Sequence, residues 1–336
     1  KELYVGGTIA KAGGLTVNNV AKWDGNAWSA LGTGITNGLV NGLTVVGTNL
    51  YVLGNFSKDA GVGAKGIARW DGSNWWALGS GVSSANCALG VGGDLYVGGG
   101  FATAGGVTAQ AIAKWNGTSW SAVGSASSVT LFGSVNAIAT VGTDLYIGGD
   151  FNFISPSFIG YIARWDGSHW NALGSGLDGQ VNALSVIDGK LYVGGTFSHA
   201  GGNNAHNFAM WDGANWIAVG SGTDGQVNAL ASGPGALYVG GSFDHAGLHP
   251  SVDFGIWYPA GQVIFKLQAS VSILSNGQIM ITWNSQPGQT YQVYSTADLS
   301  KPFTPLSGVI PSAGSTTTFT VTVTSGSTLF IRVRQL

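Results

Sequence analysis

The residues of this chain that could do chemistry recur at fixed places instead of gathering into one catalytic set. Four aspartates stand in Trp-Asp-Gly triplets: Asp24, Asp71, Asp166 and Asp212. Five asparagines follow a small apolar residue, in Val-Asn or Ala-Asn pairs: Asn41, Asn86, Asn136, Asn182 and Asn228. An aspartate before glycine is typical of a tight turn, whereas asparagine amides can bind a sugar or an ion. We therefore take the asparagines as the candidate ligand residues and the aspartates as structural.

Two interpretations of the asparagines stay open at this point. Each begins the innermost strand of a predicted repeat, at the end where the longest loops of the repeats lie. There the amides either hydrogen-bond neighbouring repeats together or form a polar ring at the mouth of a central channel. Four cations, Lys22, Arg69, Lys114 and Arg164, stand two residues before the aspartates or, in one repeat, an asparagine. Residues i and i+2 share one face of a strand, so we expect local ion pairs there.

Histidine is the other residue type that could bind a metal. His199 and His245 occupy equivalent repeat positions, with His206 and His249 near them. Because the sequence fixes no zinc-ligand set, surface histidines are the favoured interpretation and a metal site is the alternative.

No nucleophile elbow and no P-loop lysine is present, and the glycines fall in repeat turns. Cys87 is the only cysteine, which excludes an intrachain disulfide, and we expect it to pack as a small buried hydrophobe. We predict that the chain is not an enzyme, with no catalytic residue, no cofactor and no metal.

A repeat must position these residues. The signature Leu-Tyr-Val-Gly-Gly, with two altered copies, starts at residues 3, 50, 95, 145, 191 and 237, so successive copies lie 45 to 50 residues apart. Such a period indicates a solenoid, a propeller or an array. A tryptophan recurs at a constant offset, at Trp23, Trp70, Trp115, Trp165 and Trp211, and a second one follows each of these after five residues. We predict that these rings are structural and pack adjacent sheets together.

Each repeat predicts four antiparallel strands. In the fifth repeat they cover residues 181–186, 190–194, 208–211 and 216–220. The Asp-Gly pairs between them are strong hairpin signals, and the double glycine lets the backbone leave the sheet. Glutamate occurs once and glycine 57 times in 336 residues, which also favours an all-β chain.

The pattern of apolar residues ending in Gly-Gly, followed by Ile-Ala-Lys/Arg-Trp-Asp-Gly and a second tryptophan, resembles the kelch repeat. It is similar to the kelch-related repeats of large exported surface proteins, including the fungal cortical polarity-marker family. The resemblance covers residues 1 to about 265. It implies a β-propeller and a surface location, and it carries over no catalytic residues.

We predict a six-bladed propeller over residues 1–265, with a five-bladed one as the alternative. The first repeat lacks its innermost strand, and residues 262–265 form a weak last strand. Residues 266–336 contain short alternating strands, including a hairpin at Asn276-Gly277, and predict an Ig-like or fibronectin-III-like β-sandwich.

Composition restricts the partners. The net charge of −2 gives no electrostatic case for nucleic acid or an anionic membrane, and no apolar run is long enough for a membrane span. Only 8% of residues are charged, which suits an extracellular or cell-surface protein. Because the sequence starts inside a repeat, we expect a processed or trimmed N-terminus.

Three hypotheses for the function follow, in order of preference. The first is a non-enzymatic exported surface protein that mediates adhesion, or self-assembly into a filament or array, with other copies of itself or extracellular partners. Its motive is the open edge of the first repeat, which a strand from another copy could cover. The second is a lectin-like propeller that binds glycans. The third is an oxidase on a kelch scaffold, which a single cysteine in a core strand makes the weakest.

Overall fold

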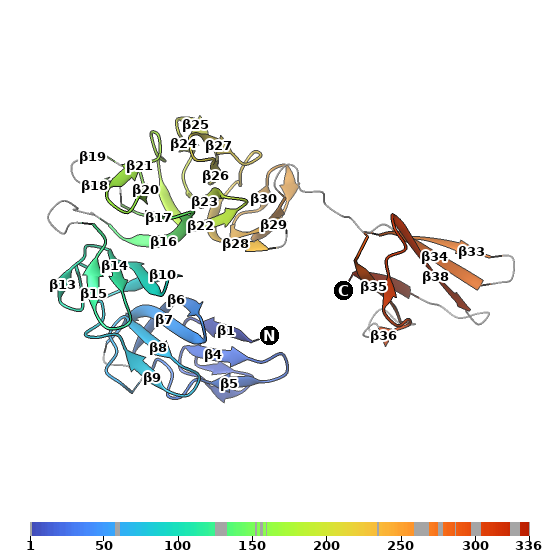
Figure 1. Cartoon of the computed structure of the whole chain (residues 1–336), viewed down its shortest axis with the longest axis horizontal. Helices are drawn as coiled ribbons and strands as arrows, with labels where there is room; N and C mark the ends of the chain where they lie inside the picture. The colour runs from blue at the N-terminus through green and yellow to red at the C-terminus, as the bar shows by residue number, and fades with distance from the viewer. Residues whose placement is uncertain are drawn as a thin grey trace. The chain divides into compact units, whose positions relative to one another are not determined.

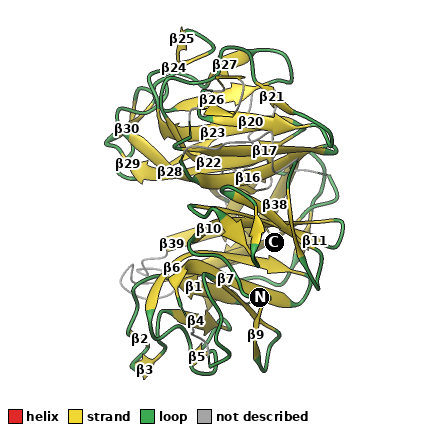
Figure 2. Ribbon diagram, turned by 90° about the vertical axis from the view of Figure 1, so that its left-hand side faces the viewer, coloured by secondary structure: helices red, strands yellow, loops and turns green. Residues whose placement is uncertain are grey.

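The computed structural model describes residues 2–57, 61–124, 133–151, 153–154, 157–158, 160–233, 235–258, 269–274, 278–285, 287–296, 304–322 and 330–335. The chain divides into two compact units, Lys1–Ala260 and Gly261–Leu336. Every regular element within the described residues is a β-strand, and Figure 2 shows no helix among them. The chain is therefore all-β, as the sequence predicts. The search for a membrane-spanning helix among the same residues found none.

Besides five two-stranded ribbons, the described part of the first unit contains six larger antiparallel sheets, in which spatial order follows chain order. The first sheet is β1 (Leu3–Gly6), β4 (Val20–Trp23) and β5 (Trp28–Ala30). The second is β6 (Gly38–Val46), β7 (Asn49–Phe56), β8 (Ile67–Trp70) and β9 (Trp75–Ala77). The third is β10 (Ala85–Val91), β11 (Asp94–Gly99), β14 (Ile112–Trp115) and β15 (Trp120–Ala122).

The remaining sheets repeat this plan. The fourth is β16 (Val135–Val141), β17 (Asp144–Gly149), β20 (Ile162–Trp165) and β21 (Trp170–Ala172). The fifth is β22 (Gln180–Ile187), β23 (Lys190–Thr196), β26 (Phe208–Trp211) and β27 (Trp216–Ala218). The sixth is β28 (Gln226–Gly233), β29 (Ala236–Ser242) and β32 (Phe254–Trp257). The sheets follow one another around an arc, with the innermost strands β6, β10, β16, β22 and β28 in succession (Figure 1).

The Trp-Asp-Gly triplets close the hairpin between the third and fourth strands of a sheet. Asp166 Oδ1 accepts hydrogen bonds from the backbone N–H groups of Ser168 and His169, at 2.8 and 2.7 Å, and Gly167 adopts a φ of +96°. Asp24, Asp71 and Asp212 cap their turns in the same way. Asn116 does so through its amide oxygen. Because these bonds favour the ionised form, with the backbone N–H of His169 the largest cause, the pKa of Asp166 falls to about 2.

The ion pairs predicted within the third strand are wrong. The carboxylates of the turn aspartates accept hydrogen bonds from the turn, and the cations reach across to the start of the second strand instead. Within the described residues the pairs are Lys22–Glu2 at 2.9 Å, Lys114–Asp94 at 3.0 Å and Arg164–Asp144 at 3.5 Å. Arg69 lies over the ring of Trp76, with 5.3 Å between its Cζ and the ring centroid. Cross-strand neighbours therefore outcompete the i, i+2 neighbour on the same strand.

A β-bulge in the innermost strand explains the double glycine. Val181 pairs with Gly195 and Ala183 with Gly194, so Asn182 is the extra residue between them. A Cβ on Gly195 would overlap the carbonyl oxygen of Gln180. The second, third, fourth and sixth sheets have the same bulge at Asn41, Asn86, Asn136 and Asn228.

The first glycine of the pair makes room for the next sheet. A Cβ on Gly98 would lie 2.5 Å from Cγ1 of Val135, and one on Gly194 would overlap Val227. Each of these valines is the first or second residue of the innermost strand of the following sheet and is fully buried. The Gly-Gly and Val-Asn signatures of consecutive repeats are therefore two sides of one contact.

The tryptophans fasten each sheet to the one before it. The two rings of a repeat lie 5.2 to 5.3 Å apart between centroids in the first five repeats. In the second, third and fifth repeats the second tryptophan donates its indole N–H to a carbonyl oxygen just after the outermost strand of the preceding sheet. These bonds run from Trp75 to Leu31, Trp120 to Leu78 and Trp216 to Leu173, at 2.8, 2.8 and 2.7 Å.

The long loop after the second strand folds into a small two-stranded ribbon that the sequence analysis did not predict. In the fifth repeat His199–Ala200 pairs with Asn203–Asn204, around Gly201 and Gly202, which both have positive φ. The ribbons are β2 (Lys11–Ala12) with β3 (Leu15–Thr16), β12 (Thr103–Ala104) with β13 (Val107–Thr108), β18 (Phe153–Ile154) with β19 (Ser157–Phe158), β24 (His199–Ala200) with β25 (Asn203–Asn204), and β30 (His245–Ala246) with β31 (His249–Pro250). The Ala-Gly-Gly triplet was the available signal, because its second and third residues need positive φ.

The second unit contains two antiparallel sheets. One is β33 (Ala269–Ile273), β34 (Gln278–Asn284) and β38 (Thr316–Thr322). The other places β36 (Thr304–Pro305), β37 (Ile310–Pro311) and β39 (Phe330–Gln335) on β35 (Thr290–Thr296). Trp283 and Tyr291 are fully buried between the sheets, with ring centroids 5.8 Å apart. The predicted turn at Asn276-Gly277, the predicted boundary at residue 265 and the weak strand 262–265 lie outside the described residues.

We expect Trp120→Ala to lower the free energy of unfolding by about 3–5 kcal/mol, because it removes a buried ring and a buried hydrogen bond. Urea denaturation measures this change. Trp76→Ala is the matched control, since this ring in the neighbouring repeat is 48% exposed, and it should cost far less. Equal effects of the two substitutions would contradict the packing role.

The pKa of Asp166 predicts a pH dependence of stability. Since the folded pKa is lowered from 3.8 to about 2, the ionised carboxylate stabilises the fold above pH 3.8, and this is lost as pH falls toward 2. Asp166→Asn keeps the turn acceptor without the charge and should weaken the loss of stability between pH 5 and 2.5. Asn116→Asp is the reverse control and should strengthen it. Chemical denaturation at both pH values tests the pair, and two unchanged profiles would disprove the assignment.

Candidate functional site

The five asparagines form a ladder along the innermost strands. The Nδ2 group of each of the first four donates to a backbone carbonyl at the start of the next sheet. The bonds run from Asn41 to Ala85 at 3.4 Å, Asn86 to Val135 at 3.4 Å, Asn136 to Val181 at 3.2 Å and Asn182 to Val227 at 2.9 Å. Amide–amide contacts also join Asn41 to Asn86, Asn86 to Asn136 and Asn182 to Asn228, at 3.2 to 3.5 Å.

This geometry uses the amides to connect sheets. The bulge turns each asparagine toward its neighbour, so the donor that a ligand would need is already engaged in the first four positions. Asn228 accepts from Asn182 but donates no hydrogen bond to another described residue. A ligand role for these residues stays a prediction, and Asn228 offers it the freest amide.

The histidines at equivalent positions make equivalent bonds. His199 Nδ1 lies 2.7 Å from Asp178 Oδ2, and His245 Nδ1 lies 2.8 Å from Asp224 Oδ2. His245 and His249 are four residues apart in sequence, a spacing that joins metal ligands on a helix, but here they lie on the two strands of a ribbon. Among the described residues no group of three His, Cys, Asp or Glu side chains is placed to hold a metal ion.

Cys87 lies in the bulged innermost strand of the third sheet. The residue is half-buried, and its sulfur lies 3.8 Å from the carbonyl oxygen of Val135. Burial of the thiol raises its pKa to about 12. A thiol with this pKa is not ionised at neutral pH and is therefore a poor nucleophile.

The exposed apolar face of the sixth sheet was not predicted from the sequence. Tyr238, Phe254 and Ile256 are 38, 53 and 47% exposed, whereas Tyr192 and Phe208, the fifth-sheet equivalents of the first two, are only 3 and 4% exposed. Tyr238 and Phe254 stack on each other, with ring centroids 6.2 Å apart. We call Tyr238, Phe254 and Ile256 the sixth-sheet face. Sequence alone gave no signal, because the residue types match those of the buried copies.

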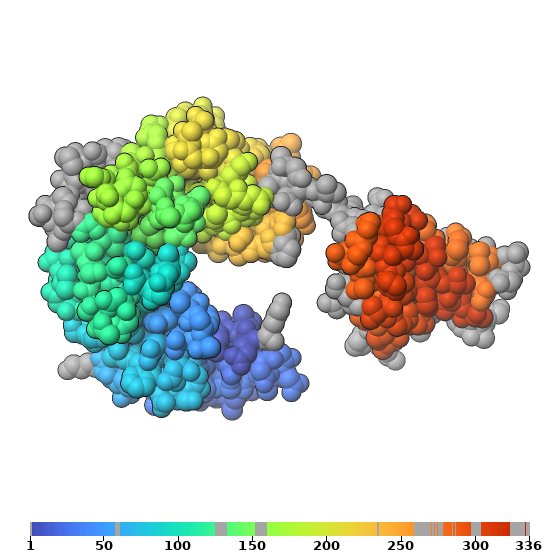
Figure 3. Space-filling model, in the orientation of Figure 1, coloured from blue at the N-terminus to red at the C-terminus, as the bar shows by residue number. Residues whose placement is uncertain are grey.

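The first sheet exposes the opposite half of the same contact. Inside the unit, Leu237, Val239 and Trp257 pack on the fifth sheet's Tyr192 and Phe208. The first-sheet equivalents of that trio are Leu3, Val5 and Trp23, which we call the first-sheet face. Leu3 is 55% exposed, although its five repeat equivalents are all at or below 4%. In the space-filling view an open gap separates the first sheet from the sixth (Figure 3).

The space beside the glycines that end the second strands also indicates that the sixth sheet lacks a neighbour among the described residues. Gly98, Gly148 and Gly194 each receive a valine of the next sheet, whereas a Cβ on Gly240 would meet only Ala229 and Asp253, at 3.9 and 4.0 Å. Among the described residues, no valine of a following sheet fills the space beside Gly240. The unit carries two complementary faces that its own described sheets leave uncovered.

We expect Asn182→Ala to cost about 1 kcal/mol of unfolding free energy, because Val227 loses a 2.9 Å hydrogen bond to its carbonyl. Asn182→Asp should cost more, since a carboxylate oxygen would face that carbonyl. Asn203→Ala, in an exposed ribbon, is the control and should change stability by less than about 0.5 kcal/mol. Urea denaturation separates the three, and a neutral Asn182→Asp would argue against the ladder.

Comparison with known proteins gives weak similarity to solved structures. No family model and no curated protein matches the chain. Among solved structures, an acylaminoacyl peptidase from Pyrococcus horikoshii, in an orthorhombic crystal form, matches with 11% identity and a TM-score of 0.40. The match covers 81% of this chain and 48% of the peptidase chain, so this chain spans about half the length of that protein. A similarity at this level assigns no activity to the chain.

Proposed function

We propose that this protein is a non-enzymatic surface scaffold whose copies join head to tail into an array. In this proposal residues 1–265 are a six-bladed β-propeller of the kelch-like type, and residues 266–336 are an Ig-like or fibronectin-III-like module. The succession of the six sheets around the arc and the outward course of their later strands support the propeller (Figure 1). The two antiparallel sheets around Trp283 and Tyr291 support the sandwich.

The observation that carries the assembly is the exposed sixth-sheet face. In the fifth sheet the equivalent side chains, Tyr192 and Phe208, are buried against the sixth sheet, so the sixth-sheet face has the side chains of a surface that a further sheet covers. Each exposed aromatic or aliphatic side chain that becomes buried contributes about 1.5–3 kcal/mol. A partner that covers this face therefore gains substantial free energy.

The first-sheet face of a second copy is the occupant that the internal contacts indicate. The proposed contact repeats an interface found inside the unit, with Leu3, Val5 and Trp23 in place of Leu237, Val239 and Trp257. Because the two faces differ, the contact is heterologous and leaves one free face at each end of a dimer. Growth then continues into a chain of copies.

A surface location is supported by composition, with only 8% charged residues and a net charge of −2. The absence of an enzymatic role is supported by how the polar side chains are used. Most of the recurrent aspartates and asparagines are engaged by backbone groups, and the thiol of Cys87 has a pKa of about 12. The oxidase hypothesis therefore gains no support.

Glycan binding is the second candidate, and Trp76 is the observation that favours it. Its ring is 48% exposed beside Arg69, and its indole N–H donates to Asp71 Oδ2 at 2.6 Å. A fixed, exposed indole with a cation and a carboxylate beside it can stack on a sugar ring. The ladder asparagines contribute less to this candidate, because their amides already bind backbone carbonyls.

Disulfide trapping tests the assembly. In the variant Leu3→Cys/Tyr238→Cys, the thiols of successive copies should meet and give a ladder of covalent multimers on a non-reducing gel after mild oxidation. Each single-cysteine variant is a control and should not extend beyond a dimer. Cys87 should not take part, because its thiol is buried.

Two outcomes contradict the proposal. Crosslinked monomers would mean that the first and sixth sheets meet within one chain, and an uncrosslinked monomer would mean that the faces do not meet. Light scattering gives an independent measure, in which Phe254→Ser should reduce the mass of any assembly. The control Val107→Ser, an exposed side chain on a ribbon, should leave the mass unchanged.

A further inference from the structure

The outer edge of β32 differs from the corresponding edge of the five other sheets. In those sheets a fourth strand pairs with this edge and always begins Trp-x-Ala. In the fifth sheet the register places Trp216 opposite Trp211 and Ala218 opposite Ala209. Among the described residues β32 has no such partner.

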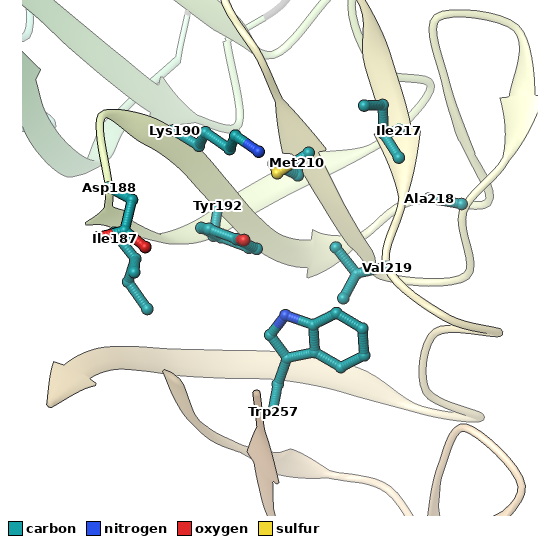
Figure 4. Close-up of a pocket in the computed structure, with 9 residues that line it drawn as sticks. All are labelled: Ile187, Asp188, Lys190, Tyr192, Met210, Ile217, Ala218, Val219 and Trp257. Carbon is teal, nitrogen blue, oxygen red and sulfur yellow. The ribbon is translucent and has the colours of Figure 1, made fainter. Parts of the chain in front are cut away.

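A cavity of about 410 Å³ lies along this edge. Gly255 and Trp257 of β32 form one wall, Ala246 and His249 of the ribbon form another, and the turn that contains Val219 closes the third. A smaller cavity of about 190 Å³ adjoins it between the fifth and sixth sheets. Figure 4 shows the indole of Trp257 facing Val219 there. The combined space is within the range of peptide and small-molecule sites. We call the larger cavity the β32 slot.

Two features of the slot match the shape of a missing indole. Gly201 and Gly105 touch the second tryptophan of their repeats, and a Cβ on Gly201 would lie 2.8 Å from the Trp216 ring. Among the described residues, a Cβ on the equivalent Gly247 would have only Ser221 Oγ near it, at 3.7 Å. The hydrogen-bond acceptor is also present. The carbonyl oxygen of Leu173 accepts from both Gly176 and Trp216.

For the sixth sheet, the carbonyl oxygen of Val219 corresponds to that of Leu173. It accepts a hydrogen bond from the N–H of Gly222 at 3.1 Å and from no indole among the described residues. The sequence also lacks the indole at the expected place, because residue 262, five after Trp257, is glutamine. The slot therefore offers three features to a strand of the type Trp-x-Ala-Leu/Val-Gly. They are the edge of β32, space for an indole ring beside Gly247, and the carbonyl oxygen of Val219 as a hydrogen-bond acceptor.

We propose that the β32 slot binds an extended segment of this type presented by another polypeptide. The segment pairs antiparallel with β32 as a fourth strand, with its tryptophan opposite Trp257 and its alanine opposite Gly255. Its indole N–H donates to the Val219 carbonyl. Of the sixth-sheet face only Ile256 also lines the slot, whereas Tyr238 and Phe254 do not, so binding here does not depend on the proposed assembly.

A synthetic peptide that copies residues 26–33, the fourth strand and flanks of the first repeat, provides the probe. Titrated into the full chain, it should bind with saturation in isothermal calorimetry. The same peptide with Trp28→Ala should bind at least about tenfold more weakly, because the indole is the buried anchor. Hydrogen exchange should slow at β32 and stay unchanged at β26, whose edge is already paired.

Protein variants locate the binding. A Cβ on Gly255 lies 3.2 Å from the Cβ of Ala246, so Gly255→Phe should fill the slot and abolish binding. Gly255→Ala restores the residue of the other repeats and should retain it. Phe254→Ser, which weakens the proposed assembly face, should also retain it, and this separates the two proposals.

Three results overturn the proposal. One is the absence of binding by the copied peptide, as would occur if the chain's own segment covers the edge. Another is equal affinity of the peptide with Trp28→Ala. The third is binding without a change in hydrogen exchange at β32. The last two comparisons require no protein variant, so the proposal remains testable even if Gly255→Phe does not fold.

Discussion

The arrangement of the first unit depends on one steric fit, between a missing side chain and a valine. The glycine at the end of the second strand leaves a space, and the valine that begins the next sheet fills it. The second repeat supports this fit, because there the small residue and the large residue have changed places. It has Leu53 where the other repeats have glycine, and the next sheet has Ala85 in place of valine. Both residues are fully buried in the same cluster, so the larger side chain changes sides while the contact remains.

This fit places the polar residues as well. The bulge beside the glycine pair sets an asparagine toward the following sheet, where its amide meets a carbonyl. Farther out, the two tryptophans of a repeat pack against the preceding sheet, and in three repeats one of them donates a hydrogen bond to it. Each sheet thus contacts its neighbours at an inner and an outer level, and stability is mainly a sum of nearest-neighbour terms.

Sequence predicted the strands well, because the period, the Asp-Gly turns and the alternation all act locally. The third strand of the fifth repeat, residues 208–211, matches the structure residue for residue. The prediction of the ion pairs was wrong because partners on neighbouring strands, such as Lys114 and Asp94, are not adjacent in the linear sequence. The exposed apolar faces could not be predicted for another reason. Tyr238 and Tyr192 are the same residue type in the same motif, and only the presence or absence of a following sheet decides which one is exposed.

The reciprocal exchange at Leu53 and Ala85 has a consequence for how such chains diversify. Two residues must be inherited together, a glycine or leucine from one repeat and the matching valine or alanine of the next. This pair spans the junction between two sheets. Recombination that cuts at this junction would bring leucine against valine or glycine against alanine, giving a clash or a void. Crossovers in the turn between the first and second strands of a sheet preserve the matched pairs, because both partners of each pair then come from one parent. Evolutionary shuffling and laboratory chimeras should therefore tolerate breakpoints in this turn better than breakpoints between sheets.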